Sequence, residues 1–198
     1  RGLGDVYKRQ NGKGKSTLLK TLMGQIPPLG GSYTVGTGVE VGYFDQQAAV
    51  AESMYPDKTV LNDFWDMYPT LKEVEVRNAL GSFLFTGEEV FKPLGQLSGG
   101  EKVRLALCKM FKMRPNLLIL DEPTRGIDVG TKIDIQKLVL DLASEGMSVT
   151  FISSETDEML RTCSRLIVMR DRKVVGELTG KDLTQAKIMS TIAGGDME

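Results

Sequence analysis

The sequence predicts an α/β fold with a mostly parallel sheet, and three observations carry this prediction. NLLILDEP (116–123) is an apolar run that ends in two carboxylates, as expected of a strand buried in a parallel sheet. SVTFIS (148–153) has the pattern of a second buried strand. A segment with helical periodicity precedes each of these strands. Alternating strands and helices place the helices on the faces of a parallel sheet.

The first helix and the segment after it lie in the N-terminal part of the chain. Four apolar residues at helical spacing follow Gly14 and Lys15 and predict a helix: Leu18, Leu19, Leu22 and Met23. Residues 30–46 carry β-branched and aromatic residues broken by glycines, which predicts a hairpin ending near Gln46. Mixed helical patterns over 57–91 predict a helical insert, and the whole helical subdomain is expected at about 57–112.

Three further elements complete the expected fold. LSGGEKVRLALCKMF (97–111) places Val103, Ala106, Leu107 and Met110 on one face of a helix. The next helix face is formed by Ile135, Leu138, Val139 and Leu142. RLIVMRDRKVVGEL (165–178) has the pattern of a second hairpin.

Composition argues against several classes of protein. The 198 residues suit one domain, and 25 basic against 26 acidic residues give no net positive field for nucleic acid or an anionic membrane. No apolar run approaches the roughly 18 residues of a membrane span. Cys108 and Cys163 are isolated and histidine is absent, so we expect reduced thiols of a cytoplasmic protein rather than a zinc site.

The first ten residues, RGLGDVYKRQ, have no signal-peptide pattern and no periodicity of a core element. They look like translated adaptor sequence, so we expect 1–10 to be a non-native leader and 11–198 to be a single domain. QNGKGKST (10–17) follows, and the phosphate-loop pattern G-x-x-x-x-G-K-[ST] asks for glycine where this chain has Arg9. Glycine accepts a turn that a bulky residue resists, so we expect weaker phosphate binding.

The loop nevertheless has the groups that phosphate binding needs. Backbone N–H groups at Gly12, Gly14 and Lys15 would surround the phosphates, the Lys15 ammonium would reach the β- and γ-phosphates, and the Ser16 hydroxyl would bind Mg²⁺. An ordinary loop remains the alternative for so short a motif. The candidate nucleotide contacts here are Asn11, Gly12, Lys13, Gly14, Lys15, Ser16 and Thr17.

Two acids and a glycine-rich segment supply the remaining chemistry. Asp121 is placed to hold Mg²⁺ and Glu122 to polarise a water, although a solvated turn is the alternative. Ser98, Gly99, Gly100 and Glu101 precede a helix and form a candidate anion site, with a simple helix cap as the alternative. A second anion site has a use if two domains face each other and share nucleotides.

Together, NGKGKST, the glutamine near 46, LSGGE, LLILDE and Asp128 closely resemble the ATP-binding cassette (ABC) ATPases. The resemblance implies a P-loop NTPase fold with a helical subdomain, ATP and Mg²⁺ as cofactors and a second cassette as partner. It places Lys15, Ser16 and Thr17 in Walker A, 97–101 in the signature, Asp121 and Glu122 in Walker B, and Asp128 in the D-loop. Gln46 would be the Q-loop residue, acting in catalysis and on Mg²⁺, with Gln47 as the alternative.

Within that superfamily the chain resembles two groups. Residues 11–124, including GYFDQQ and LSGGEKVRLALCKM, resemble the second cassette of ABC-F proteins, which implies a ribosome partner. Residues 125–198 resemble the C-terminal cassette of simple-sugar importer ATPases, which implies a membrane permease and a serine, Ser154, at the catalytic switch position. We hypothesise a chimera joined near LDEPT, with an unusual natural cassette as the alternative; sequencing single source DNA molecules through this point tests it.

The departures from the family pattern leave the activity open. The strands that normally precede Walker A are expected to be missing, and Ser154 in place of histidine predicts slow turnover. The leading expectation is ATP hydrolysis by a sandwich dimer of cassettes in the cytoplasm, at the inner face of the membrane if a permease is bound. A nucleotide-binding module without useful turnover and a chimeric fragment without function are the alternatives.

Overall fold

The computed structural model describes residues 15–45, 49, 54–171 and 173–194. The chain divides into two compact units, 39–152 and a unit formed by 1–38 with 153–198, and each is considered by itself. The expected leader at 1–10 lies outside the described residues. The boundaries expected for a single domain and its helical subdomain stay a prediction.

A three-stranded parallel sheet forms the centre of the unit 39–152. Its strands are β1 (Val41–Asp45), β2 (Leu117–Asp121) and β3 (Ser148–Ile152), in the order β1-β2-β3. Leu118 and Leu120 of β2 are buried, which agrees with the apolar run that predicted the strand. In β3 only Phe151 is buried, so the prediction of a buried strand is correct in position and wrong in the extent of burial. Among the described strands, β3 lies at one side of the sheet and has only β2 beside it.

The hairpin predicted over 30–46 is not formed. Residues 32–36 have no strand, and β1 pairs in parallel with β2 rather than with its own preceding segment. Tyr33 and Val35 are 40% and 49% exposed, so their side chains lack the burial that favours a strand. The β-branched and aromatic residues of 30–40 therefore gave a misleading signal, because local composition does not show which strand will be the partner.

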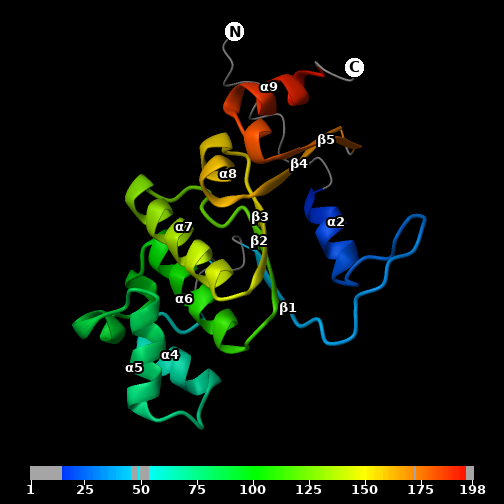
Figure 1. Ribbon diagram of the computed structural model, residues 1–198. Coiled ribbons are helices and arrows are strands. Elements are labelled where there is room, and N and C mark those ends of the chain that lie inside the picture. Colours follow the sequence, from blue (N-terminus) through cyan, green and yellow to red (C-terminus); the bar gives the residue numbers. More distant parts are fainter. Residues whose placement is uncertain (1–14, 46–48, 50–53, 172, 195–198) are drawn as a thin grey trace. The chain divides into compact units, whose positions relative to one another are not determined.

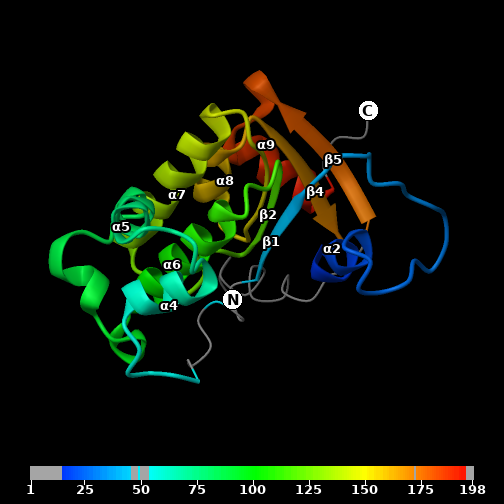
Figure 2. The same ribbon diagram turned by 90° about the horizontal axis from the view of Figure 1, so that it is seen from below.

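Helices α6 (Gly99–Lys112) and α7 (Val129–Ser144) cover one face of this sheet, and α4 (Val60–Met67) and α5 (Glu73–Ser82) form a helical layer beside α6. The short turns η1 (Gly87–Phe91) and η2 (Leu94–Gln96) follow α5. Helices α6 and α7 lie side by side against the sheet (Figures 1 and 2). The helical patterns predicted over 57–91, 97–111 and 135–142 are confirmed.

Polar contacts connect α4 with α6. Lys109 of α6 pairs with Asp63 of α4, and the Tyr68 hydroxyl donates to the Lys109 carbonyl at 2.7 Å. Phe64 is fully buried beside them. The helical layer and α6 are therefore joined by both apolar packing and ion pairing, so α6 is fixed at its far end from the signature.

The second unit contains α2 (Lys15–Leu22), α8 (Thr156–Thr162), β4 (Arg165–Arg170), β5 (Lys173–Thr179), η3 (Gly180–Asp182) and α9 (Gln185–Ala193). Strands β4 and β5 are antiparallel, which confirms the hairpin predicted over 165–178. A small core joins this hairpin to α9 and consists of Leu166, Val168, Leu178 and Ile188. No helix of the described residues combines the length and the apolar character needed to cross a bilayer.

Candidate functional site

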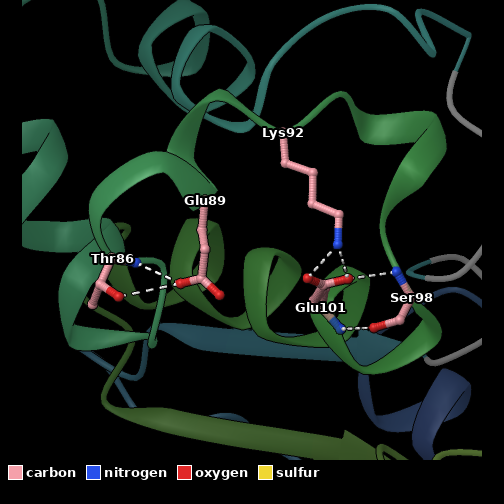
Figure 3. A network of polar contacts seen from close by, with 5 residues as sticks. All are labelled: Thr86, Glu89, Lys92, Ser98 and Glu101. Carbon is pink, nitrogen blue, oxygen red and sulfur yellow. Dashed lines mark hydrogen bonds and ion pairs between the residues drawn. The ribbon is translucent and has the colours of Figure 1, made fainter.

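The signature segment, residues 97–101, forms the N-terminus of α6 (Figure 3). Ser98 is the N-cap: its hydroxyl accepts a hydrogen bond from the Glu101 N–H at 3.3 Å. In return the Glu101 carboxylate accepts from the Ser98 N–H at 2.6 Å, which completes a capping box. The segment therefore forms the helix cap that the sequence offered as the alternative to an anion site. Ser98 and Gly99 are also exposed, so an anion can approach the Ser98 hydroxyl and the first residue of α6.

A lysine outside the motif joins this network. The Lys92 Nζ lies 2.8 and 3.0 Å from the two carboxylate oxygens of Glu101 (Figure 3). Earlier in the chain, a second capping box ties Glu89 to Thr86. The signature carboxylate therefore has a positive neighbour as well as a backbone donor.

These contacts set the charge state of Glu101. Burial raises the pKa of this carboxyl, but the hydrogen bonds from Lys92 and Ser98 and the charge of Lys92 outweigh burial and hold the pKa below its ordinary value. Glu101 is therefore a carboxylate at neutral pH. Its stabilising contribution is present above the unfolded-state pKa and is lost as the pH falls through the lower pKa of the folded state.

The signature lies directly against the loop that contains Asp128. A Cβ added at Gly100 would overlap the methyl group of Thr131 and lie 3.2 Å from Ile127 Cγ2. Thr131 is itself fixed by Asp128, the N-cap of α7, which accepts from the Thr131 N–H at 3.0 Å and the Thr131 hydroxyl at 2.8 Å. Two predicted site segments, 98–101 and Asp128, are therefore brought together within one unit.

The two acids end the central strand. Asp121 is the last residue of β2 and is 9% exposed, while Glu122 follows with a φ of 51°. A positive φ is uncommon for a side chain as large as glutamate, and such strain persists where the surroundings fix the backbone. Here the Glu122 N–H donates to the Ile152 carbonyl at 2.9 Å, and the Arg125 N–H donates to the Glu122 carbonyl at 3.1 Å. The backbone therefore fixes where the Glu122 side chain begins.

Strand register adds two residues that the sequence analysis did not single out. Asp45 is the register partner of Asp121, so two carboxylates lie side by side at the carboxyl end of the sheet. Tyr43 is on the same side of β1, two residues earlier. Its hydroxyl is buried without a hydrogen bond of good geometry in the described part of the chain, and burial and the charges of Asp121 and Asp45 raise its pKa to about 12. The sequence signal was the acid and aromatic in GYFDQQ, directly before Gln46.

The other predicted site residues are less fully described. Lys15, Ser16 and Thr17 begin α2, which confirms that a helix opens at this motif. Asn11, Gly12, Lys13, Gly14 and Gln46, with its alternative Gln47, lie outside the described residues. Ser154 is half-buried two residues after β3, in the other unit. Contacts between the phosphate loop and Walker B therefore remain predictions.

The donor chemistry of the acids suits Mg²⁺. Magnesium prefers carboxylate, hydroxyl and amide oxygens, and Asp121 offers a buried carboxylate next to that of Asp45. Within the described ranges no three acidic, cysteine or histidine side chains form a ready metal cluster. In phosphate-binding sites Mg²⁺ is usually held by one or two carboxylates together with phosphate oxygens.

A family model decides the assignment. The model described as ABC transporter matches residues 10–125, more than half of the chain. The chain belongs to the ABC transporter family. The resemblance drawn from the motifs is confirmed at this level.

Relatives of two kinds resemble this ABC domain. The protein YdiF of Bacillus subtilis, named for ATP binding, is 43% identical over 157 residues, which cover 79% of this chain and 24% of YdiF. The ribose import ATP-binding protein RbsA of Caldanaerobacter subterraneus is 34% identical over 209 residues, covering 93% of this chain and 42% of RbsA. The chain thus spans between about a quarter and two fifths of these relatives. Both matches cross residue 124, because each covers more than three quarters of the chain.

Solved structures confirm the ABC fold. The dimeric post-hydrolysis structure of the ATP-binding cassette MJ0796, bound to ADP and Pi, superposes with a TM-score of 0.66 at 21% identity, covering 85% of this chain and 81% of that one. The fold class predicted from the sequence, a P-loop α/β cassette, is confirmed by this likeness.

Proposed function

We propose that this ABC domain binds Mg-ATP between its own Walker motifs and the signature of another cassette, and hydrolyses it. The observation that carries the proposal is the arrangement of the signature. Its exposed Ser98 and the N-terminus of α6 lie beside the Asp128 loop, and the sheet that α6 covers ends in Asp121 and Glu122. An anion site that faces outward from one cassette is suited to a phosphate held by a second one.

The proposed roles follow the chemistry of each group. The phosphate loop, residues 11–17, would surround the phosphates with Lys15 on the β- and γ-phosphates. Ser16, Gln46 and Asp121 would hold Mg²⁺, and Glu122 would polarise the attacking water. Ser98, Gly99, Gly100, Glu101 and Asp128 would contact the nucleotide of the partner cassette.

The two resemblances support two different processes that ATP hydrolysis could drive. Similarity to RbsA supports work with a membrane permease in sugar import, at the inner face of a membrane. The ABC-F-like motifs of 11–124 support a role with the ribosome in the cytoplasm. In both cases we propose that a second cassette is the immediate partner, because the signature and the Walker motifs act on different nucleotides.

Phosphate release by the purified chain tests the proposal. We expect saturable release with Mg-ATP that is lost in Lys15→Ala, together with binding of a fluorescent ATP analogue. Binding without release above the Lys15→Ala background would instead indicate a nucleotide-binding module without turnover. Absence of binding in the unsubstituted chain would contradict the proposal.

The role of Ser154 at the switch position is tested by a separate substitution. Ser154 has no group that can take up and return a proton near neutral pH, whereas histidine has. If Ser154 limits turnover, Ser154→His should speed phosphate release by about tenfold or more, toward the 10²–10⁴ typical of a positioned acid-base group. ATP binding should be unchanged. Equal release rates in the two proteins would show that position 154 does not limit the reaction.

A further inference from the structure

The signature of this chain contains a charge that works against its proposed ligand. The N-terminus of α6 attracts anions because its first N–H groups and the helix dipole are positive. Glu101 lies in the first turn of this helix and places a carboxylate at the same point. Its side chain is only 14% exposed and accepts from the Ser98 N–H at 2.6 Å, so the carboxylate is held close to the cap.

Lys92 compensates this charge. Its ammonium contacts both oxygens of Glu101, at 2.8 and 3.0 Å, and its side chain is 34% exposed (Figure 3). Hydrogen bonds between charged groups are stronger than neutral ones, and a partly buried pair is less screened by salt than an exposed one. The Lys92–Glu101 pair therefore lowers the repulsion that an approaching phosphate would meet at this helix end.

The backbone of Lys92 is also fixed. Its carbonyl accepts from the Val60 N–H at 3.1 Å, at the start of α4. Two residues on, the Leu94 N–H donates to the Lys58 carbonyl at 2.9 Å. These bonds fix the backbone of Lys92 beside the start of α4, so its side chain begins at a defined position from which the ammonium reaches Glu101 at the start of α6.

We propose that Lys92 is a positioning residue of the signature, which neutralises Glu101 and keeps it in the capping box so that the helix end can accept the phosphate of ATP bound to the partner cassette. The inference rests on the function proposed above and adds a residue outside the signature motif. Its substrate class is the same Mg-ATP.

The test uses the whole chain carrying Glu122→Gln, so that ATP is held without turnover. Dimer formation is followed by light scattering against Mg-ATP concentration in Lys92→Met, Glu101→Gln, the double variant, Lys92→Arg and Lys137→Met. Met keeps the apolar stem of lysine without its charge, and Gln keeps the capping acceptor without the carboxylate. Lys137 is exposed on α7 and serves as the matched control.

We expect Lys92→Met to raise the Mg-ATP concentration for half-maximal dimerisation by about tenfold, the size expected for one lost hydrogen bond between charged groups. The double variant should dimerise as Glu101→Gln does, Lys92→Arg should recover part of the loss, and Lys137→Met should match the parent. Binding of a fluorescent ATP analogue at protein concentrations too low for dimers should stay the same in all of them.

Two results would overturn the inference: dimerisation of Lys92→Met at the parental ATP concentration, or a double variant as impaired as Lys92→Met. The second would show that Lys92 acts on something other than Glu101. A parent that binds ATP and never dimerises would instead refute the function proposed above, so the two failures are distinguishable.

Discussion

In the Glu122→Gln variant, phosphate release is expected to fall by about 10²–10⁴-fold while ATP binding is kept. Glutamine has nearly the same size and hydrogen-bonding reach as glutamate, but it cannot take a proton from the attacking water. Phosphate contacts are proposed for the loop 11–17, so this change leaves them intact. Release and analogue binding are measured side by side on the same preparations.

The backbone at Glu122 makes the variant a clean test. The positive φ and the hydrogen bond to Ile152 belong to the main chain and persist when the side chain changes to an amide. Glu145→Gln, at an exposed position after α7, is the matched control and should release phosphate at the parental rate. Unchanged release in Glu122→Gln would remove this residue from the proposed catalytic role.

Gly100→Ala is expected to destabilise the unit 39–152 by about 1–3 kcal/mol, the usual cost of overpacking. The new methyl group would overlap the Thr131 methyl, and Thr131 cannot rotate away without losing its hydrogen bond to Asp128. Alanine favours a helix over glycine by about 1 kcal/mol, which offsets only part of this cost. Urea unfolding measures the difference.

The neighbouring glycine supplies the control. A Cβ at Gly99 would meet no atom within 4 Å, so Gly99→Ala should be neutral or slightly stabilising. Adding Thr131→Ser to Gly100→Ala removes the overlapping methyl and keeps the hydroxyl, and should restore most of the lost stability. If Gly100→Ala unfolds at the urea concentration of the parent, the signature does not pack closely against α7.

The strands that the sequence predicted well have strong local patterns. LLIL is buried and continuous, and the 165–178 hairpin pairs residues that are close in the chain. The segment 30–46 failed because β1 takes its partner from a strand more than seventy residues later. Pairing over such a distance depends on tertiary packing, which local propensity does not report.

In the candidate site, too, the residues that depend on local sequence were predicted and those that depend on tertiary contacts were not. Asp121, Glu122 and the N-cap role of Ser98 follow from local sequence, since each depends on a strand end or a helix start. Lys92 and Tyr43 were missed, because their importance arises from Glu101 and Asp121, to which folding brings them. GYFDQQ marks the aromatic and the acid before Gln46, but a local pattern does not show which residues folding will bring beside them.

The mass of the Glu122→Gln chain in saturating Mg-ATP tests the central claim most directly. Light scattering should give a monomer without nucleotide and a dimer with it, and the isolated dimer should contain two ATP molecules, one for each pairing of Walker motifs with a partner's signature. A chain that binds ATP and stays a monomer at every protein concentration would contradict the claim that two cassettes share the nucleotide.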